Sequence, residues 1–412
     1  MNPLLQKLQP YPFERLRTLL GGSAPPPGLP VIDLSIGEPK HATPTLVTTA
    51  LASSLGTLSS YPKTAGTDEL RGTIAAWLAT RYGLKCVDAA TQVLPVCGSR
   101  EALFSFAQAC LDPGGDASVV IPTPVYQIYE GAALMAGARP LFVAITPESG
   151  FRMPLDRIRE EQWRRVRLVY TCSPGNPTGY VMRPDEWRVL FGLSDRYGFV
   201  VASDECYSEI YSDERNPPLG GLQASDQLGR KDFERLVVFG SLSKRSNAPG
   251  LRSGFVAGDA GLLAAFLKYR TYHGSAMSPG VQAASVAAWR DETHVIDNRR
   301  RYAEKFAAVT SSIAAVLPTS APDAGFYLWA RTPGDDCAYA RRLFEQGGVI
   351  VLPGSFLGRP VDGVNPGAGF VRIALVADLP EVREAARRIV QCGRTDQSNA
   401  TAARDAHALS SK

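Results

Sequence analysis

The first residues that could carry out chemistry follow two strongly apolar segments. FVVASDECY ends an expected strand with Asp204. SLSKRSNAPGLRSGF follows another expected strand and places Lys244 among hydroxyl groups, with Arg252 eight positions further on. An acid at the carboxyl end of an inner strand is typical of the place where open α/β sheets bind ligands. The pattern therefore indicates a ligand site, although a lysine among serines is also an ordinary surface feature.

Three further groups extend this set. CSPGNPTGY places Asn176 in a loop that Pro and Gly restrict, which suits an amide presented to a ligand. GSREAL (98–103) is a strand-to-helix turn whose free N–H groups suit a phosphate, and Tyr207 follows three residues after the strand-end acid. Together the groups match a ligand with a phosphate, a protonatable ring nitrogen, a phenolic oxygen and an aldehyde that condenses with an amine. Pyridoxal 5'-phosphate has all four features.

The segment from about residue 90 to 260 must position these groups, and it alternates between strand, turn and helix. Near-continuous apolar runs such as VRLVY and FVVAS are typical of strands that are covered on both faces. Seven segments are predicted as strands: TQVLPVCG, ASVVIP, ARPLFVAI, RRVRLVYTC, GFVVASDE, RLVVFGSLS and RSGFVAG. This alternation predicts a mostly parallel, wound α/β sheet.

The remainder of the chain predicts a smaller α/β domain and a tail. We expect residues 1–45 to form an N-terminal arm and part of the small domain, because GGSAPPPGLP cannot hold a helix or strand. Residues 46–280 are expected to form the large cofactor-binding domain, and residues 281–393 the small C-terminal domain. The polar segment 394–412 is expected to be disordered.

Composition argues against several other classes of protein. Lys and Arg number 44 against 40 Asp and Glu, a net charge of +4 without a block of one sign, so nucleic acid is not an expected partner. No run of 18 apolar residues could span a bilayer, and charges and prolines interrupt the first twenty residues, so neither a membrane nor export is expected. The seven cysteines are scattered and the four histidines lack ligand spacing, which favours reduced thiols, a cytoplasmic location and no metal.

The segments also stand in a familiar order. IGEP, YPKTAG…ELR, GSREAL, PTPVY, NPTG, SDECY, SLSK, GLRSG and FVRIAL occur between about residues 31 and 375, and together they resemble the fold-type I (class I/II) aminotransferases, which use pyridoxal 5'-phosphate. Each motif alone is moderately specific, whereas nine in register are very specific. The resemblance implies an α/β fold-type I architecture, with a mostly parallel seven-stranded sheet between helices and a smaller α/β domain.

The resemblance implies roles around the cofactor ring. Lys244 would form the Schiff base with the cofactor aldehyde and then move the α-proton of the substrate. Asp204 would keep the pyridine nitrogen protonated. Asn176 and Tyr207 would hydrogen-bond the phenolic oxygen, and Tyr126 would stack on the ring.

The resemblance implies a phosphate site as well. Five residues of this chain would hold the phosphate: Ser99, Arg100, Ser241, Ser243 and Arg252. Arg252 would matter most, because a guanidinium fork matches phosphate oxygens. For Arg100 the backbone N–H alone would be enough to bind the phosphate, with the side chain facing away. Tyr61 would reach the phosphate from a partner subunit, which implies a homodimer.

The remaining implied residues concern the substrate. Arg372 would hold the α-carboxylate bidentately, with Gly37 and Asn176 beside the substrate. Contacts to the distal end of the substrate lie outside the motifs, and the candidates are Ile36, Gly37, His273 and Ser275.

Within the family, the opening NPLLQKLQPYPFERLRTLL and the segments IGEPKHATP and RTYHGSAMSP resemble the bacterial N-succinyldiaminopimelate aminotransferases of lysine biosynthesis. This resemblance implies transfer of an amino group between N-succinyl-L,L-diaminopimelate and 2-oxoglutarate. The motifs are also compatible with an aspartate, alanine or LL-diaminopimelate aminotransferase and with a C–S β-lyase, because cofactor residues are shared across reactions. A catalytically silent cofactor-binding protein is disfavoured, because it would have no need of the Lys244 amine.

Overall fold

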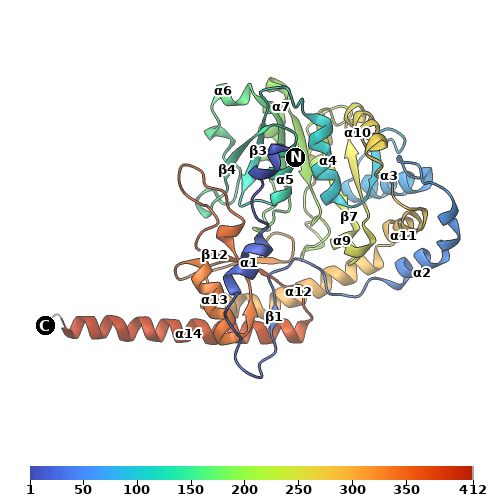
Figure 1. Cartoon of the computed structure of the whole chain (residues 1–412). Helices are drawn as coiled ribbons and strands as arrows, with labels where there is room; N and C mark the ends of the chain where they lie inside the picture. The colour runs from blue at the N-terminus through green and yellow to red at the C-terminus, as the bar shows by residue number, and fades with distance from the viewer. Residues whose placement is uncertain (411–412) are drawn as a thin grey trace.

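A seven-stranded sheet forms the centre of the larger part of the molecule (Figure 1). The computed structural model describes residues 1–410, and for residues 395–410 it describes only the course of the helix. The strands are β2 (Val93–Val96), β3 (Ser118–Thr123), β4 (Arg139–Ala144), β5 (Val166–Cys172), β6 (Val200–Asp204), β7 (Leu236–Ser241) and β8 (Gly254–Gly258). Their order is β2-β8-β7-β6-β5-β3-β4, with only β8 antiparallel to its neighbours. All seven predicted strands and the mostly parallel sheet are therefore confirmed.

Helices cover both faces of this sheet because the inner strands present apolar side chains to both faces. On β6, Val201 packs into one core, whereas Val200 and Ala202 pack into the core on the opposite face. The helices on the first face are α3 (Asp68–Tyr82), α7 (Pro184–Tyr197), α8 (Gly221–Gln227) and α11 (Pro279–Arg290), and those on the second are α4 (Ser99–Cys110), α5 (Gln127–Met135) and α10 (Ala260–His273). Burial of both faces explains the continuous apolar runs of these strands.

A second group of elements holds a smaller core at the lower side of Figure 1. β1 (Ile32–Asp33) pairs with β10 (Val349–Ile350), and β12 (Phe370–Ala374) lies between β11 (Leu352–Pro353) and β9 (Tyr327–Arg331). The accompanying helices are α1 (Pro12–Leu20), α12 (Thr293–Ala314), α13 (Asp336–Gly347) and α14 (Leu379–Ser410). The arm thus joins the C-terminal elements through β1, while the boundaries predicted at residues 45, 280 and 393 stay a prediction.

The remaining helices are short or lie near the sheet edges. They are α2 (Thr45–Ser53), α6 (Glu160–Trp163) and α9 (Leu242–Arg245), with the 3-10 helices η1 (Pro3–Lys7), η2 (Leu55–Ser59), η3 (Pro147–Ser149), η4 (Leu155–Arg157), η5 (Pro249–Leu251) and η6 (Gly354–Phe356). As expected, the Pro- and Gly-rich residues 21–30 contain no helix or strand. No helix among the described residues is sufficiently long and apolar to cross a membrane.

The tail differs from the prediction of disorder over residues 394–412. Helix α14 continues to Ser410 and projects from the body of the molecule in Figure 1. Alanine has the highest helix propensity, and it recurs at positions 400, 402, 403, 406 and 408. The low hydrophobicity that suggested disorder is therefore compatible with a helix, and residues 411 and 412 lie outside the described part of the chain.

Candidate active site

The carboxyl ends of the parallel strands bring the predicted residues to one edge of the sheet. Asp204 is the last residue of β6, Lys244 lies on α9 directly after β7, and Asn176 lies in the loop after β5. Ser99 begins α4 after β2, and Tyr126 caps α5 after β3. One pocket at this edge is lined by Tyr11, Pro12, Phe13, Ile36, Gly37, Ser99, Arg100, Tyr126, Gln127, Cys172, Asn176, Asp204, Cys206, Tyr207, Lys244, Tyr327, Leu357 and Arg372.

Lys244 extends into this pocket as a partly neutral amine. Its Nζ donates a hydrogen bond to the carbonyl oxygen of Gly37. Burial lowers the pKa of Lys244 to about 8, and the positive charge of Arg372 acts in the same direction. About one tenth of the amine is therefore unprotonated at pH 7, far more than for an ordinary lysine, and the neutral form is what a nucleophile or a proton acceptor requires.

The pKa of Lys244 predicts a pH profile for cofactor attachment. Cofactor-free protein should take up pyridoxal 5'-phosphate slowly at pH 6, because the amine is then protonated. The rate should rise with a midpoint near the Lys244 pKa of about 8 rather than 10.5. The growth of the visible absorbance band measures this rate, and the same titration with Nα-acetyl-lysine corrects for ionisation of the aldehyde reagent. A midpoint above pH 10 would contradict the assigned environment.

Asp204 is a buried carboxylate whose hydrogen-bond partners are all neutral. Its side chain is 4% exposed, its Oδ2 accepts from the hydroxyl of Tyr129 at 2.6 Å, and its Oδ1 accepts from the N–H of Cys206 at 3.2 Å. Burial raises the pKa of Asp204, while these hydrogen bonds oppose the rise. A buried carboxylate of this kind fits a cationic ring nitrogen, because an opposite charge would stabilise its ionised form.

A cluster of hydroxyl groups and a guanidinium surrounds the start of α4. The Oγ of Ser99 accepts a hydrogen bond from Cys206 Sγ at 2.9 Å, and Ser241 donates to Ser243 across 3.0 Å. The guanidinium of Arg252 lies so close to Gly98 that a Cβ there would come within 2.3 Å of its Nη2. Gly98 has φ +91°, which requires glycine, and a Cβ there would also displace the guanidinium. Free N–H groups at a helix start, hydroxyls and a guanidinium together fit a phosphate group.

The side chain of Arg100 has other contacts than those that its predicted phosphate role requires. Its Nε donates to the hydroxyl of Tyr126 at 2.7 Å, and its guanidinium carbon lies 5.9 Å from the ring centroids of Tyr11 and Tyr126. The side chain is exposed and turned toward the N-terminal arm. Its backbone N–H, in the first turn of α4, still fits the phosphate.

Arg372 is a buried cation without a carboxylate partner among the described residues. It is 3% exposed, and its guanidinium donates to Asn176 Oδ1 at 2.9 Å and to the carbonyl of Ser35 at 2.7 Å. The ring of Tyr327 lies 4.4 Å from its guanidinium carbon, and its Nε has no hydrogen-bond partner within the described part of the chain. An unpaired buried guanidinium fits a bound carboxylate.

Tyr207 and Gly37 meet at Tyr327, which the sequence did not single out. The hydroxyls of Tyr207 and Tyr327 lie 2.9 Å apart, and burial raises the pKa of Tyr207. A Cβ on Gly37 would come within 1.8 Å of the Tyr327 hydroxyl, so only glycine fits beside it. The sequence also did not single out Tyr129 and Cys206 as residues of the site. The helical spacing of Tyr129 from Tyr126 is the one signal that could have indicated it.

Six predicted residues do not line this pocket: Ser241, Ser243 and Arg252, which belong to the cluster at the start of α4, and Tyr61, His273 and Ser275, which lie elsewhere in the chain. Tyr61 is fully exposed between η2 and α3. His273 ends α10, where its exposed ring lies 5.8 Å from that of Tyr269, and Ser275 accepts hydrogen bonds from Arg270 at 3.1 Å. The suggestion that His273 and Ser275 contact the distal end of the substrate is therefore unsupported by the geometry of this chain, because neither residue lines the pocket.

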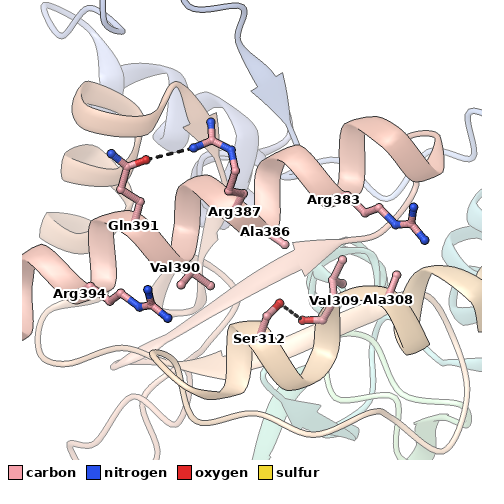
Figure 2. Close-up of a pocket in the computed structure, with 9 residues that line it drawn as sticks. All are labelled: Ala308, Val309, Ser312, Arg383, Ala386, Arg387, Val390, Gln391 and Arg394. Atoms are coloured by element: carbon pink, nitrogen blue, oxygen red, sulfur yellow. Dashed lines mark hydrogen bonds between the residues drawn. The ribbon is translucent and has the colours of Figure 1, made fainter.

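A second hollow lies between α12 and α14, far from this chemistry (Figure 2). Arginines 383, 387 and 394 surround an apolar floor that includes Val309 and Val390, and Arg387 donates to Gln391. Its lining contains no carboxylate, and its hydroxyl group, on Ser312, donates to the carbonyl oxygen of Val309 at 2.9 Å. The hollow thus lacks the acid–base groups that the pocket at the sheet edge combines.

Comparisons with known proteins agree with this geometry. Residues 30–389 match the family described as "Aminotransferase class I and II". An aminotransferase of Neisseria meningitidis Z2491 has a solved structure with 54% identity and a TM-score of 0.92, covering 95% of this chain and 99% of that one. An LL-diaminopimelate aminotransferase of Nitratidesulfovibrio vulgaris (strain DP4) is 33% identical, over 88% of this chain and 92% of its own. A probable N-succinyldiaminopimelate aminotransferase of Thermus thermophilus is 28% identical with a TM-score of 0.83, covering 92% of this chain and 100% of that one.

Proposed function

Since the chain belongs to the class I and II aminotransferases, which use pyridoxal 5'-phosphate, we propose that it transfers the amino group of N-succinyl-L,L-diaminopimelate to 2-oxoglutarate. The observation that carries this proposal is the charge of the pocket. Among its lining residues, Arg100 and Arg372 are cationic and Asp204 is the one acid, while Lys244 is assigned to the cofactor. Because Asp204 is buried and suited to the ring nitrogen, the pocket mouth favours a substrate whose far end is anionic.

The positions of several residues in and beside the pocket support the following assignments. When bound, the cofactor supplies an aldehyde that condenses with amines and a protonated ring that withdraws electrons from the substrate. Lys244 Nζ binds the cofactor and, once released, accepts and returns the α-proton of the substrate. Asp204 holds the proton on the ring nitrogen, Asn176 and Tyr207 orient the phenolic oxygen, and Tyr126 covers the ring. The hydroxyl cluster with Arg252 binds the phosphate.

Substrate capture is assigned to two arginines at different depths. Arg372 binds the α-carboxylate, which all amino-acid substrates share, through its buried fork. Arg100, exposed at the mouth beside Tyr11, meets a distal carboxylate. Glutamate and the succinylated compound both have such a group, so one site can serve both halves of the reaction. Ile36 and Gly37 also line the pocket.

LL-diaminopimelate itself is the second candidate, because curated relatives at 30–33% identity have that name. Its distal end has a free ammonium beside the carboxylate, whereas the succinyl group removes that positive charge. No lining residue other than the buried Asp204 could neutralise an ammonium group. The pocket charge therefore favours the succinylated compound.

A comparison of substrates tests the proposal. Values of kcat/KM are measured for N-succinyl-L,L-diaminopimelate, LL-diaminopimelate, aspartate and alanine with 2-oxoglutarate as acceptor, while pyruvate release from a thioether amino acid is measured in parallel. The proposal expects the first compound to have the highest value. A higher value for LL-diaminopimelate would select the second candidate, and faster pyruvate release than transamination would identify a C–S β-lyase.

Arg100→Met should separate the substrates by their distal group. We expect kcat/KM to fall about 10- to 100-fold for glutamate and the succinylated compound, because each loses a hydrogen bond to a charged group. Alanine, which has no distal carboxylate, should change less than about threefold. Arg139→Met, at an exposed position on β4, is the matched control. An equal loss for alanine would place Arg100 at the cofactor instead.

We also propose a homodimer in which Tyr61 completes the phosphate site of the partner subunit. The full exposure of this tyrosine in the single chain supports the proposal, because a large aromatic side chain is then free for such a contact.

A further inference from the structure

The short helix that bears Lys244 ends in carbonyl groups that need partners. Helix α9 (Leu242–Arg245) has four residues, so its last carbonyls cannot be satisfied within the helix. The amide of Asn298, on α12, donates from Nδ2 to the carbonyl oxygens of Lys244 and Arg245 at 3.2 and 3.4 Å. Asn298 is 1% exposed, so no solvent competes for these two bonds. One side chain from α12 therefore fixes the backbone of the reactive lysine.

Two donors fix the orientation of this amide. Asn298 Oδ1 accepts from His41 Nδ1 at 2.9 Å and from Asn247 Nδ2 at 3.1 Å. A flipped amide would set its NH₂ group against both donors and its oxygen against the two carbonyls of α9. The arrangement also requires the proton of His41 to lie on Nδ1, which leaves Nε2 as an acceptor.

Lys305 supplies the donor for that acceptor. Its Nζ donates to His41 Nε2 at 2.7 Å and to the carbonyl of Val376 at 3.2 Å, and the lysine is 2% exposed. Burial lowers the pKa of Lys305 to about 8, and the charge of Asp378 opposes this effect. Burial of a lysine without a hydrogen-bonded carboxylate is costly, so packing alone does not account for its presence.

From this continuous set of contacts we infer that Asn298 is a positioning residue for Lys244, and that His41 and Lys305 fix Asn298 in turn. The inference goes beyond the proposed function and holds for any substrate. The segment Gly37–His41 acts on Lys244 in two ways. The carbonyl oxygen of Gly37 accepts the hydrogen bond from Lys244 Nζ, and His41 acts through Asn298 on the backbone of Lys244. None of the three positioning residues lines the pocket, so their effect is on the direction of the Lys244 amine and not on substrate binding.

Two pairs of variants test this inference. Asn298→Leu removes the amide at similar volume, and His294→Asn is the matched control, because His294 also lies on α12 and bonds Ser246 at 2.8 Å without touching Lys244. His41→Leu breaks the contacts to both neighbours, whereas His41→Asn retains a donor near the position of Nδ1. The measurements are the rate of pyridoxal 5'-phosphate uptake by cofactor-free protein, the pH midpoint of that uptake, and kcat and KM per bound cofactor.

Asn298→Leu is expected to slow cofactor uptake and lower kcat by about 10- to 100-fold, because a displacement of about 1 Å has this effect on reacting groups. Its uptake midpoint should move from that of the unaltered protein, and KM should stay within about twofold because Arg372 is untouched. His41→Leu should lower both rates less, and His41→Asn should restore most of the loss. His294→Asn should leave both rates unchanged.

Three results would overturn the inference. The first is an Asn298→Leu protein that is less stable but has unchanged uptake, midpoint and kcat per bound cofactor. The second is an equal effect of His294→Asn. If Asn298→Leu does not fold, as judged from its thermal unfolding, the His41 pair decides: equal rates for His41→Leu and His41→Asn would contradict a positioning role.

Discussion

Replacing Lys244 by alanine is expected to lower kcat by about 10⁴-fold or more, the largest effect of any single substitution in this chain. The variant loses both the nucleophile for the cofactor and the group that moves the α-proton. The cofactor would be retained only through its phosphate and ring contacts, so the visible band of the protein should also be lost. Absorbance spectra and single-turnover rates with glutamate measure the two effects separately.

Two variants control for charge and for lysine content. Lys244→Arg retains a cation but cannot supply a neutral amine near neutral pH, so it should be as inactive as the alanine variant. Lys268→Ala removes an exposed lysine of α10 and should leave the rate unchanged. A Lys244→Ala protein with an unaltered visible band would assign the cofactor linkage to another amine.

Replacing Arg372 by lysine is expected to lower kcat/KM by about 10²-fold for every amino-acid substrate, mainly through a higher KM. The ammonium retains the charge but cannot form two parallel bonds to a carboxylate. It also cannot span the positions where the guanidinium now meets Asn176 and the carbonyl of Ser35. Steady-state kinetics with glutamate, alanine and N-succinyl-L,L-diaminopimelate measure the loss.

A uniform loss is the diagnostic feature of this second prediction, because the α-carboxylate is common to all three substrates. Arg331→Lys, on the neighbouring strand β9 and exposed, should change none of the values. A loss confined to one substrate would show that Arg372 contacts the side chain of that substrate and not the α-carboxylate. The α-carboxylate would then need another partner.

Much of the sheet and its polar edge could be predicted from the sequence. Strands such as β5 and β6 are apolar on both faces, and each has a polar residue at its carboxyl end: Ser173 follows β5, and Asp204 is the last residue of β6. Strand direction then places such residues at one edge, which requires no knowledge of side-chain packing. The family was indicated by a resemblance, namely the order of nine motifs along the chain.

Features that depend on tertiary packing could not be predicted in this way. Tyr129 reads as a core residue of α5, and only the proximity of β6 makes it a donor to Asp204. The direction of the Arg100 side chain depends on Tyr11 and Tyr126, which lie in distant segments. His41 reads as an isolated histidine until α12 brings Asn298 beside it. In each case the local sequence pattern specifies the helix or strand, but it does not specify which other segment packs beside it.

The most direct test of the proposed function is a single-turnover experiment on the purified, cofactor-loaded protein. N-succinyl-L,L-diaminopimelate is added in the absence of acceptor, the visible band is followed, and 2-oxoglutarate is added once the absorbance is constant. The proposed aminotransferase predicts rapid loss of the band, its full return with 2-oxoglutarate, and one glutamate formed per site. Loss of the band with glutamate but not with the succinylated compound would contradict the proposed substrate. An unchanged band with both compounds would contradict amino-group transfer by this site.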